Sequence, residues 1–289
     1  MFVRAGEYGA MQSKAASTGC PSFDELLMDN GVPYNSVLLL QEDWPRSSVN
    51  YASLICKSFL AEGVLKREKC LLVVNGGDGV NGDFMKSLPE HLESNDSQSS
   101  DKDNKDFDEK LTIAWRYKNL QHGVDKSNTK SSLFSFGGRM SETIALKYID
   151  VCGYSQSLDF KPYKRVVVIG FGSPDFEGDF DLIIKLKQCQ AACVITSPFH
   201  CVDNEKNTKM CHLCDCVIRV ERSRAVKDVE CFLNIVKPFT LLKQYLPDTL
   251  SLHIKLDHRK RLLVSPFHLP PDLGGTDKPG SCSTVENAF

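Results

Sequence analysis

Residues 37–63 have the layout of a phosphate-binding loop, which is a strand, a tight loop and then a helix. Residues 37–40, Val-Leu-Leu-Leu, form a short apolar run of the kind expected for a buried strand. In the helical pattern that follows, one face carries the apolar residues Val49, Ala52, Cys56, Phe59 and Leu60. The sequence therefore predicts the frame of a nucleotide site.

The loop itself lacks the residues that phosphate chemistry needs. Such a loop normally has glycines for close backbone approach, a lysine for the phosphates and a Ser or Thr for magnesium. Here it has no glycine and no lysine, and it contains Glu42, Asp43, Trp44, Pro45, Arg46, Ser47 and Ser48. A carboxylate close to a triphosphate would cost roughly 4 kcal/mol at an effective dielectric constant of about 20. We predict a rigid connector or part of a subunit interface, and the alternative is a rebuilt ATPase site in which Arg46 replaces the lysine.

A second element of phosphate-loop enzymes is also missing. The apolar run at residues 166–171 predicts a central parallel strand, which in an active enzyme would end in an acid that holds magnesium. Here Gly172, Ser173 and Pro174 follow, and the first acid is Asp175. We therefore predict no catalytic residue, no cofactor and no ATP hydrolysis by this chain alone.

Two basic clusters are candidate RNA contacts. They are Arg219, Arg222, Arg224 and Lys227 in one cluster, and Arg259, Lys260 and Arg261 on an expected hairpin turn. Such runs are more often solvated surface than binding sites. If they bind RNA, they act through phosphates and shape, so binding should depend strongly on salt.

A cluster of cysteines and histidines suggests zinc as a further possibility. Its members are Cys201, Cys211, Cys214 and Cys216, with His200 and His212 nearby. A structural zinc site usually shows two regularly spaced pairs, whereas this segment has one Cys-x-x-Cys and a third Cys two residues on. Cys216 also begins an apolar run, where a buried thiol is expected. We predict no metal, and a zinc-bearing nucleic-acid module remains a third option.

The composition is that of an ordinary globular protein, with 42% hydrophobic and 25% charged residues among 289. The net charge of −2 gives no bulk argument for nucleic-acid binding, so any electropositive surface must be local. No apolar run is long enough to cross a membrane, and no signal peptide follows Met1. The twelve cysteines are expected as free thiols, which predicts the cytoplasm, with the nucleus as a second compartment.

The order of elements predicts an α/β fold with a mostly parallel, twisted sheet flanked by helices. Apolar runs predict strands at residues 37–40, 70–75, 166–171, 193–196 and 217–220. Helices are expected at residues 180–190 and at residues 141–151, where Ile144, Ala145, Tyr148 and Ile149 share a face. Residues 231–236, 252–256 and 261–265 then predict three strands without intervening helices, hence antiparallel additions near the C-terminus.

One large domain is expected over residues 17–273, between a disordered lead at residues 1–16 and a flexible tail at residues 274–289. It opens with a short helix for which Ser22 is the expected N-cap, with Glu25 three residues on. Three internal segments are also assigned: a disordered acidic insert at residues 93–109, a strand at residues 111–117 and a linker at residues 122–138.

Several motifs resemble a known family. The start STGCPSFDELL, the Gly-Val-Pro lead into the first strand and the helix end FLAEG look like RecA-type ATPase cores of the circadian-clock and recombinase kind. Because the phosphate loop is lost, the resemblance narrows to the PAXNEB family, the fourth subunit of Elongator. The motifs are STG at 17–19, Asp24, LL at 26–27, FLAEG at 59–63, IAWRY at 113–117, RM at 139–140, GSP at 172–174, LHI at 252–254 and HLPPD at 268–272.

This resemblance implies a RecA-like fold without ATPase motifs. It also implies a hexameric ring with the fifth and sixth Elongator subunits, two copies of each. That ring binds tRNA and joins the catalytic part of Elongator, which modifies wobble uridines at carbon 5. The chain is then expected to be a non-catalytic subunit whose partners are other Elongator subunits and tRNA, with no membrane.

Overall fold

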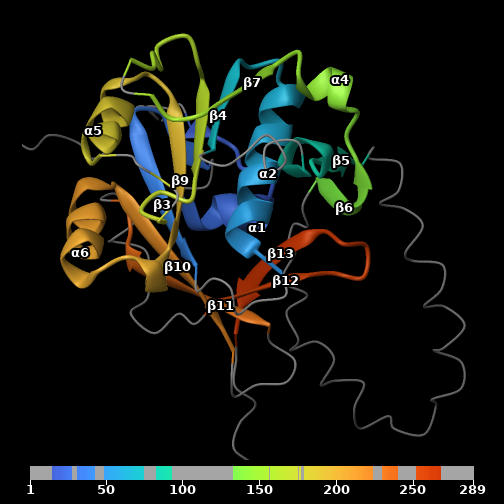
Figure 1. Ribbon diagram of the computed structural model, residues 1–289. Coiled ribbons are helices and arrows are strands. Elements are labelled where there is room, and N and C mark those ends of the chain that lie inside the picture. Colours follow the sequence, from blue (N-terminus) through green and yellow to red (C-terminus); the bar gives the residue numbers. More distant parts are fainter. Residues whose placement is uncertain are drawn as a thin grey trace, which may run out of the picture.

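The computed structural model describes residues 15–27, 31–42, 49–74, 83–92, 133–155, 157–174, 176, 179–223, 230–239 and 252–267. Its main feature is a nine-stranded sheet in the order β13-β12-β11-β10-β3-β9-β8-β4-β7, with helices on both faces (Figure 1). Two smaller sheets, β1-β2 and β5-β6, have two strands each. The predicted fold class, a mostly parallel sheet flanked by helices, is confirmed.

Six neighbouring strands of the large sheet run parallel. They are β3 (Ser36–Glu42), β4 (Cys70–Val74), β7 (Ile149–Cys152), β8 (Arg165–Ile169), β9 (Ala192–Pro198) and β10 (Cys216–Arg222). Every residue of β3, β4 and β9 is buried, as expected for parallel strands covered on both faces. All six strands therefore end at one edge of the sheet, the carboxyl edge, and begin at the opposite amino edge.

Three antiparallel strands extend the sheet beyond β10, as the sequence predicts. They are β11 (Cys231–Lys237), β12 (Leu252–Leu256) and β13 (Leu262–Pro266). Because β12 runs in the same direction as β10, the turn between β12 and β13 also lies at the carboxyl edge.

A short helix, α1 (Pro21–Asp24), covers the outer edge of β13. The backbone N–H of Val264 donates to Ser22 Oγ at 3.0 Å, and Cys20 Sγ donates to the Leu262 carbonyl at 3.5 Å. A strand edge that is bonded in this way does not present a free row of donors and acceptors to another chain. The prediction that Ser22 is the N-cap is wrong, because Cys20 has that position and the Ser22 hydroxyl binds the strand.

Helices cover both faces of the sheet. α2 (Tyr51–Leu65) lies with α1 and α4 (Glu142–Ala145) on one face. α5 (Asp181–Gln188) and α6 (Asn204–Leu213) lie on the other (Figure 1). In the part of the chain that the structure describes, no helix is long and apolar enough to span a bilayer.

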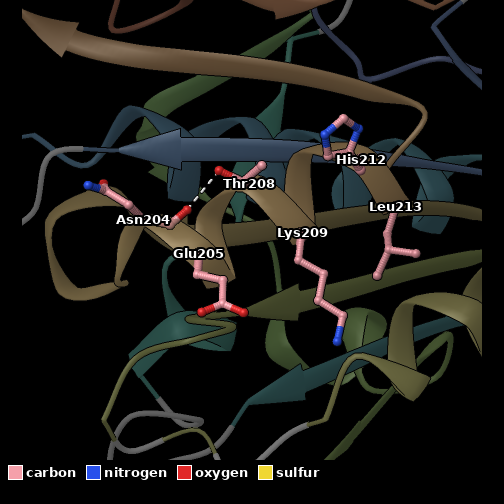
Figure 2. Close-up of a pocket in the computed structure, with 6 residues that line it drawn as sticks. All are labelled: Asn204, Glu205, Thr208, Lys209, His212 and Leu213. Atoms are coloured by element: carbon pink, nitrogen blue, oxygen red, sulfur yellow. Dashed lines mark hydrogen bonds between the residues drawn. The ribbon is translucent and has the colours of Figure 1, made fainter.

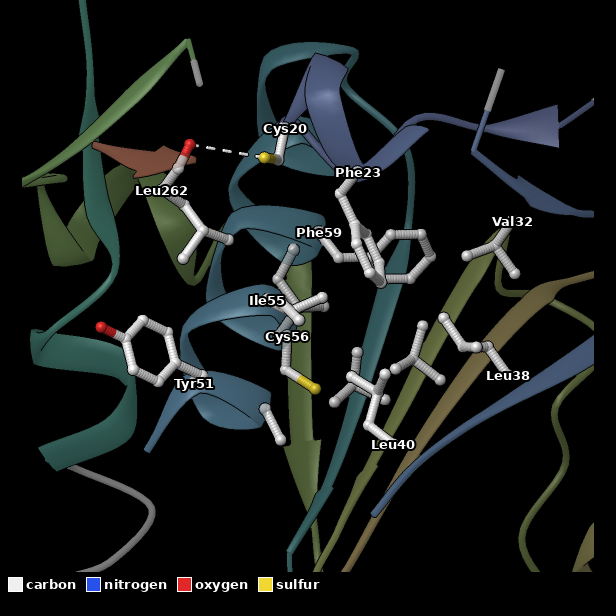
Figure 3. Close-up of a cluster of buried hydrophobic side chains, with 14 of the residues drawn as sticks. Cys20, Phe23, Val32, Leu38, Leu40, Tyr51, Ile55, Cys56, Phe59 and Leu262 are labelled. Carbon is white, nitrogen blue, oxygen red and sulfur yellow. Dashed lines mark hydrogen bonds between the residues drawn. The ribbon is translucent and has the colours of Figure 1, made fainter. Parts of the chain in front are cut away.

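The central strand β3 supplies side chains to two separate hydrophobic clusters. Leu38 and Leu40 belong to the cluster beside α2, which Figure 3 shows, whereas Val37 and Leu39 belong to the cluster under α5 and α6. This division follows from the alternation of side chains along a strand. Both clusters consist of buried apolar side chains, so burial on two faces holds β3 in the middle of the fold.

The predicted helix at residues 141–151 is wrong over its second half. α4 ends at Ala145, and Ile149 begins β7, whose residues pair with β4 from Cys70 onward. The apolar spacing fits a helix, but pairing at the sheet edge decides the outcome, which is a tertiary effect. Ile144 is 53% exposed, so the predicted apolar face of the helix is not a buried one.

Other differences concern short elements. The predicted linker at residues 122–138 is wrong at its end, because β6 (Phe134–Arg139) pairs with β5 (Pro89–His91). Ala15 and Ala16, which the sequence places in a disordered lead, form β1 (Ala15–Ala16) against β2 (Val32–Pro33). Short 3₁₀ turns occur at Glu25–Leu27 and Phe199–Cys201. The acidic insert at residues 93–109, the strand at residues 111–117 and the tail at residues 274–289 lie outside the described residues.

A fully buried arginine joins the start of the domain to its core. Arg165, at the beginning of β8, has no exposed side-chain surface, and its Nε lies 2.5 Å from Glu68 Oε2. Its Nη1 donates to the carbonyls of Ser17 and Phe59 at 2.6 and 3.0 Å. The guanidinium also lies over the Phe59 ring at 4.6 Å. One side chain thus connects the first turn, α2, β8 and the loop before β4.

Candidate functional site

The carboxylate of Glu42 occupies the N-terminus of α2. Glu42 ends β3, and its side chain folds toward the helix so that Oε1 accepts from the Tyr51 N–H at 2.9 Å. Its Oε2 accepts from the Ala52 N–H at 3.1 Å, and the residue is only 5% exposed. A helix N-terminus favours an anion, because its first N–H groups are unpaired and the helix dipole is positive there. Glu42 is that anion in this protein.

The remaining N–H groups of the first turn are bonded as well. The Asn50 side chain is the N-cap and accepts from the Ser53 N–H at 2.7 Å. The Leu54 N–H reaches the Asn50 carbonyl at 3.1 Å. In a phosphate-binding loop these same amides would face the phosphates. The first turn of α2 therefore has its own acceptors for each of these four amides.

A second carboxylate is bound to the side chain of Tyr51, the first residue of α2. Tyr51 is fully buried, and its hydroxyl donates to Glu230, just before β11. Burial, together with the hydrogen bond and negative charge of Glu230, raises the pKa of Tyr51 above its ordinary value. A nucleotide phosphate at this helix end would compete with Glu42 for the Tyr51 and Ala52 amides. The other residues of the candidate loop, Asp43, Trp44, Pro45, Arg46, Ser47 and Ser48, lie outside the described residues.

The strand that would hold magnesium in an ATPase ends in a glycine-rich turn. After β8, Gly170 and Gly172 have φ values of 76° and 80°, a conformation that favours glycine. The Gly170 N–H donates to Thr196 Oγ1 at 2.9 Å and the Phe171 N–H donates to the Thr196 carbonyl at 2.9 Å. The turn is thus tied to β9. Asp175, the first acid after the strand, lies outside the described residues.

Arg219 of the first basic cluster is engaged within the protein. Its Nε and Nη2 both donate to Gln41 Oε1 at 3.2 Å, and its guanidinium lies 3.8 Å from the centre of the Phe199 ring. Gln41 in turn donates to Asn207 Oδ1 at 2.5 Å, which links β3 to α6. Arg222, at the end of β10, is exposed, and Arg224 and Lys227 lie outside the described residues.

The second basic cluster is the turn between β12 and β13. Arg261 donates from Nε to Asp257 Oδ2 at 2.8 Å, and its Nη2 lies 2.8 Å from the same oxygen. Burial alone would raise the pKa of Asp257, but hydrogen bonds from the Arg261 N–H and guanidinium hold it below its ordinary value. Lys260 is exposed, with a left-handed φ of 57°, and Arg259 is half-buried. The turn is therefore rigid and directs Lys260 into solvent.

The cysteine segment belongs to the end of α6, a helix that the sequence patterns did not predict. Cys211 lies in its last turn, Cys214 follows the helix and Cys216 begins β10. Lys237 Nζ donates to the carbonyls of Cys211, His212 and Cys214 at 3.2, 3.1 and 2.6 Å, and so caps the helix C-terminus with a cation.

This arrangement favours helix capping over metal binding. Burial raises the pKa of Cys214 and of Cys216 to about 12, and the prediction that Cys216 is a buried thiol in a strand is confirmed. Cys201, in contrast, is exposed. Among the described residues, no group of three or more His, Cys, Asp or Glu side chains is placed to hold a metal ion.

An open depression of about 610 Å³ lies against the outer side of α6 (Figure 2). Its lining comes from that single helix: Asn204, Glu205, Thr208, Lys209, His212 and Leu213. Lys209 Nζ lies 4.5 Å from the centre of the Phe180 ring, and Thr208 Oγ1 donates to the Asn204 carbonyl at 2.8 Å. These groups do not converge on a common point, so the depression has no arrangement suited to catalysis.

Sequence reasoning located the candidate loop but missed what occupies it. The sequence predicted that the loop carboxylates, Glu42 and Asp43, would repel a nucleotide, whereas Glu42 also accepts hydrogen bonds from the helix amides that a nucleotide would bind. Asn50 before an apolar helical run is an ordinary N-cap signal that the sequence contains. No sequence signal joins Lys237 to the end of α6, because 23 residues separate Lys237 from Cys214.

The class of protein follows from the sheet and the site. The first long strand, β3, lies between β9 and β10 and leads through a loop into α2, which defines a RecA-like α/β domain. In this domain the phosphate position at the start of α2 contains the Glu42 carboxylate.

Comparisons with known proteins identify the relatives. The model of the family described as PAXNEB protein matches residues 12–139. Elongator complex protein 4 of Dictyostelium discoideum is 22% identical over 351 residues, covering 94% of this chain and 78% of that protein. The Mus musculus protein of the same name is 26% identical over 336 residues, covering 90% of this chain and 78% of its own length. The chain is thus similar to Elongator complex protein 4 over most of its length, and to the PAXNEB family model over residues 12–139.

Among solved structures, the flagellar accessory protein FlaH from Methanocaldococcus jannaschii aligns with a TM-score of 0.49 and 10% sequence identity. The alignment covers 84% of this chain and 94% of FlaH.

Proposed function

We propose that this protein is a non-catalytic RecA-like subunit of an Elongator assembly. Two observations support the proposal, and the first is the homology to Elongator complex protein 4. The second, which carries the non-catalytic part, is the Glu42 carboxylate bonded to the Tyr51 and Ala52 amides. An amide that already donates to a buried carboxylate is not available to a phosphate.

In this proposal the chain joins the fifth and sixth subunits in a ring that binds tRNA. The ring supports modification of wobble uridines at carbon 5 by the catalytic Elongator subunits, in the cytoplasm and also the nucleus. The carboxyl edge is the surface we assign to tRNA, because Arg222, Arg259 and Lys260 lie along it. Arg219 and Arg261 position this edge through Gln41 and Asp257. Contacts of this kind read phosphates and shape rather than base sequence.

The alternative function is an active ATPase of the RecA or clock type, with Arg46 in place of the loop lysine. No contact of a described residue favours it, since the helix end that would bind phosphate is occupied by Glu42. A joint between two subunits, with the lysine supplied by a neighbour, would place any ATPase activity in the assembled ring and not in the lone chain.

Titration of the isolated chain with ATP and magnesium is expected to give no heat of binding up to millimolar nucleotide. The physical reason is that an incoming phosphate must displace the negatively charged Glu42 carboxylate from two buried amides. Isothermal calorimetry measures this directly. A micromolar dissociation constant would overturn the proposal. Loss of ATP hydrolysis in an Arg46→Ala variant would instead establish the rebuilt ATPase site.

Replacement of Lys260 by asparagine is expected to weaken tRNA binding by about threefold and to lower the salt slope by about 1. Asparagine tolerates the left-handed φ of 57° at this position, so the turn should keep its shape. Fluorescence anisotropy with labelled tRNA, at several salt concentrations, tests this on the chain assembled with its co-purifying partners. Lys86→Gln, which removes an exposed lysine outside the β12–β13 turn, is the control. Equal affinity and slope in both variants would remove the carboxyl edge from the tRNA surface.

A further inference from the structure

A second polar site lies at the amino edge of the sheet, opposite the edge where α2 begins. A cavity of about 690 Å³ opens there between the loops that precede β3, β4, β8 and β9. Its lining residues are Tyr34, Asn35, Arg67, Glu68, Lys69, Lys164 and Gln190, and we name it the basic pocket. Its volume falls within the range of small-molecule sites, roughly 300–1,000 Å³.

The charge of the basic pocket is positive. Three of its side chains are cations, namely Arg67, Lys69 and Lys164, and only Glu68 is an acid. The Glu68 carboxylate is already bound on the inner side, by buried Arg165 Nε at 2.5 Å and by the Tyr34 hydroxyl at 3.3 Å. Glu68 therefore does not neutralise the three cations that face solvent.

The three cations differ in the partners that they have within the protein. Lys69 Nζ lies 3.3 Å from Asp150 Oδ2 and 5.0 Å from the centre of the Tyr163 ring. The Asp150 carboxylate therefore offsets part of the positive charge of Lys69. That ion pair is half-exposed, and such pairs contribute about 0–1 kcal/mol, so a stronger anion can replace it. Arg67 and Lys164 are both exposed at the rim. These two side chains are the principal candidates for binding an anion.

Main-chain hydrogen bonds fix the rim of the basic pocket. The Asn35 N–H donates to the Ala191 carbonyl at 3.0 Å, and the Lys164 N–H donates to the Lys69 carbonyl at 2.8 Å. Asn35 and Arg67 also have left-handed φ values of 58° and 55°, which are uncommon for residues other than glycine. The loops are thus held in defined conformations, and the backbone positions of the cationic residues are fixed.

We propose that the basic pocket binds phosphate groups. An arginine presents a planar fork of donors to phosphate oxygens, and lysines add point charges beside it. Asn35 and Gln190 supply neutral donors on the same rim. The phosphates belong either to an RNA backbone or to a free phosphorylated small molecule, since both present the same oxygens. This site is separate from the carboxyl edge and does not depend on the function proposed above.

The test compares an Arg67→Asn/Lys164→Gln variant with the unaltered chain. Asparagine is compatible with the left-handed φ at position 67, and glutamine keeps most of the length of Lys164. The control variant, Lys86→Gln, removes an exposed lysine outside the pocket. The probes are inorganic pyrophosphate, followed by calorimetry, and fluorescein-labelled tRNA, followed by anisotropy over a salt series. Thermal melts measured by circular dichroism check that each variant folds.

The pocket variant is expected to bind at least one probe about tenfold more weakly, while the control changes less than about twofold. A loss of binding that is confined to pyrophosphate identifies a free phosphorylated ligand. A loss of binding that is confined to tRNA, together with a weaker dependence of tRNA affinity on salt, identifies an RNA backbone. Unchanged binding of both probes by a well-folded variant overturns the proposal, as does equal competition by an acidic peptide, polyglutamate. If the double variant melts without cooperativity, Lys164→Gln alone provides the same test, with an expected loss of about threefold.

Discussion

Replacing Arg165 by alanine is expected to lower the free energy of unfolding by about 3–5 kcal/mol. The arginine is fully buried, and its removal leaves Glu68, whose side chain is only 20% exposed, without its closest partner. The carbonyls of Ser17 and Phe59 lose a charged donor at the same time. Urea denaturation followed by circular dichroism gives the unfolding free energy of each protein.

The control for this prediction removes both charges together. An Arg165→Met/Glu68→Gln variant fills most of the space and leaves no unpaired buried charge, so it should lose no more than about 2 kcal/mol. The difference between the two variants combines the cost of leaving Glu68 unpaired with the packing that methionine restores at position 165. Equal losses in the two variants would show that the lost hydrogen bonds to the Ser17 and Phe59 carbonyls, and not an unpaired Glu68, account for the effect.

Replacing Glu42 by alanine is expected to cost about 2–3 kcal/mol of unfolding free energy. The change leaves the Tyr51 and Ala52 amides without the acceptor that they have in the buried first turn of α2. It also removes a negative charge from the positive end of the helix dipole. ATP binding is not expected to appear, because the loop still has no glycine and no lysine.

Two further variants make the Glu42 prediction specific. Glu42→Gln keeps one acceptor oxygen and should lose only about 1 kcal/mol. Glu205→Ala removes an exposed acid from the first turn of α6 and should stay within about 0.5 kcal/mol of the unaltered chain. Thermal and urea unfolding measure all three. If Glu42→Ala were as stable as the unaltered chain, the carboxylate would not be the capping group that we describe.

Most of the sheet could be predicted from the sequence. The apolar runs that become β3, β4, β8 and β9 are buried on both faces, and a strand in that position needs a continuous apolar sequence. The antiparallel additions were also recognisable, because three strands follow one another without helices. The helix predicted over residues 141–151 failed because Ile149 pairs at a sheet edge, where tertiary contacts outweigh helical spacing.

The candidate site was only partly predictable. A loop without glycine or lysine can be recognised from residue types, since folding cannot supply side chains that are absent. The partners of the basic residues could not be recognised in the same way. Arg219 reaches Gln41 across 178 positions of the chain, and nothing in either neighbourhood of the sequence indicates the pairing.

By itself, the sequence determined the strand order along the chain and the loss of phosphate-loop chemistry, because both depend on residue type and local pattern. Only the tertiary structure decided that Glu42 turns back onto α2, that Lys237 caps α6 and that Arg165 becomes buried beside Glu68. The basic pocket at the amino edge also forms only in the tertiary structure, because its lining residues come from loops that are distant in the sequence. The physical reason is that strand register and packing bring distant residues within hydrogen-bond distance, and local sequence does not specify those distances.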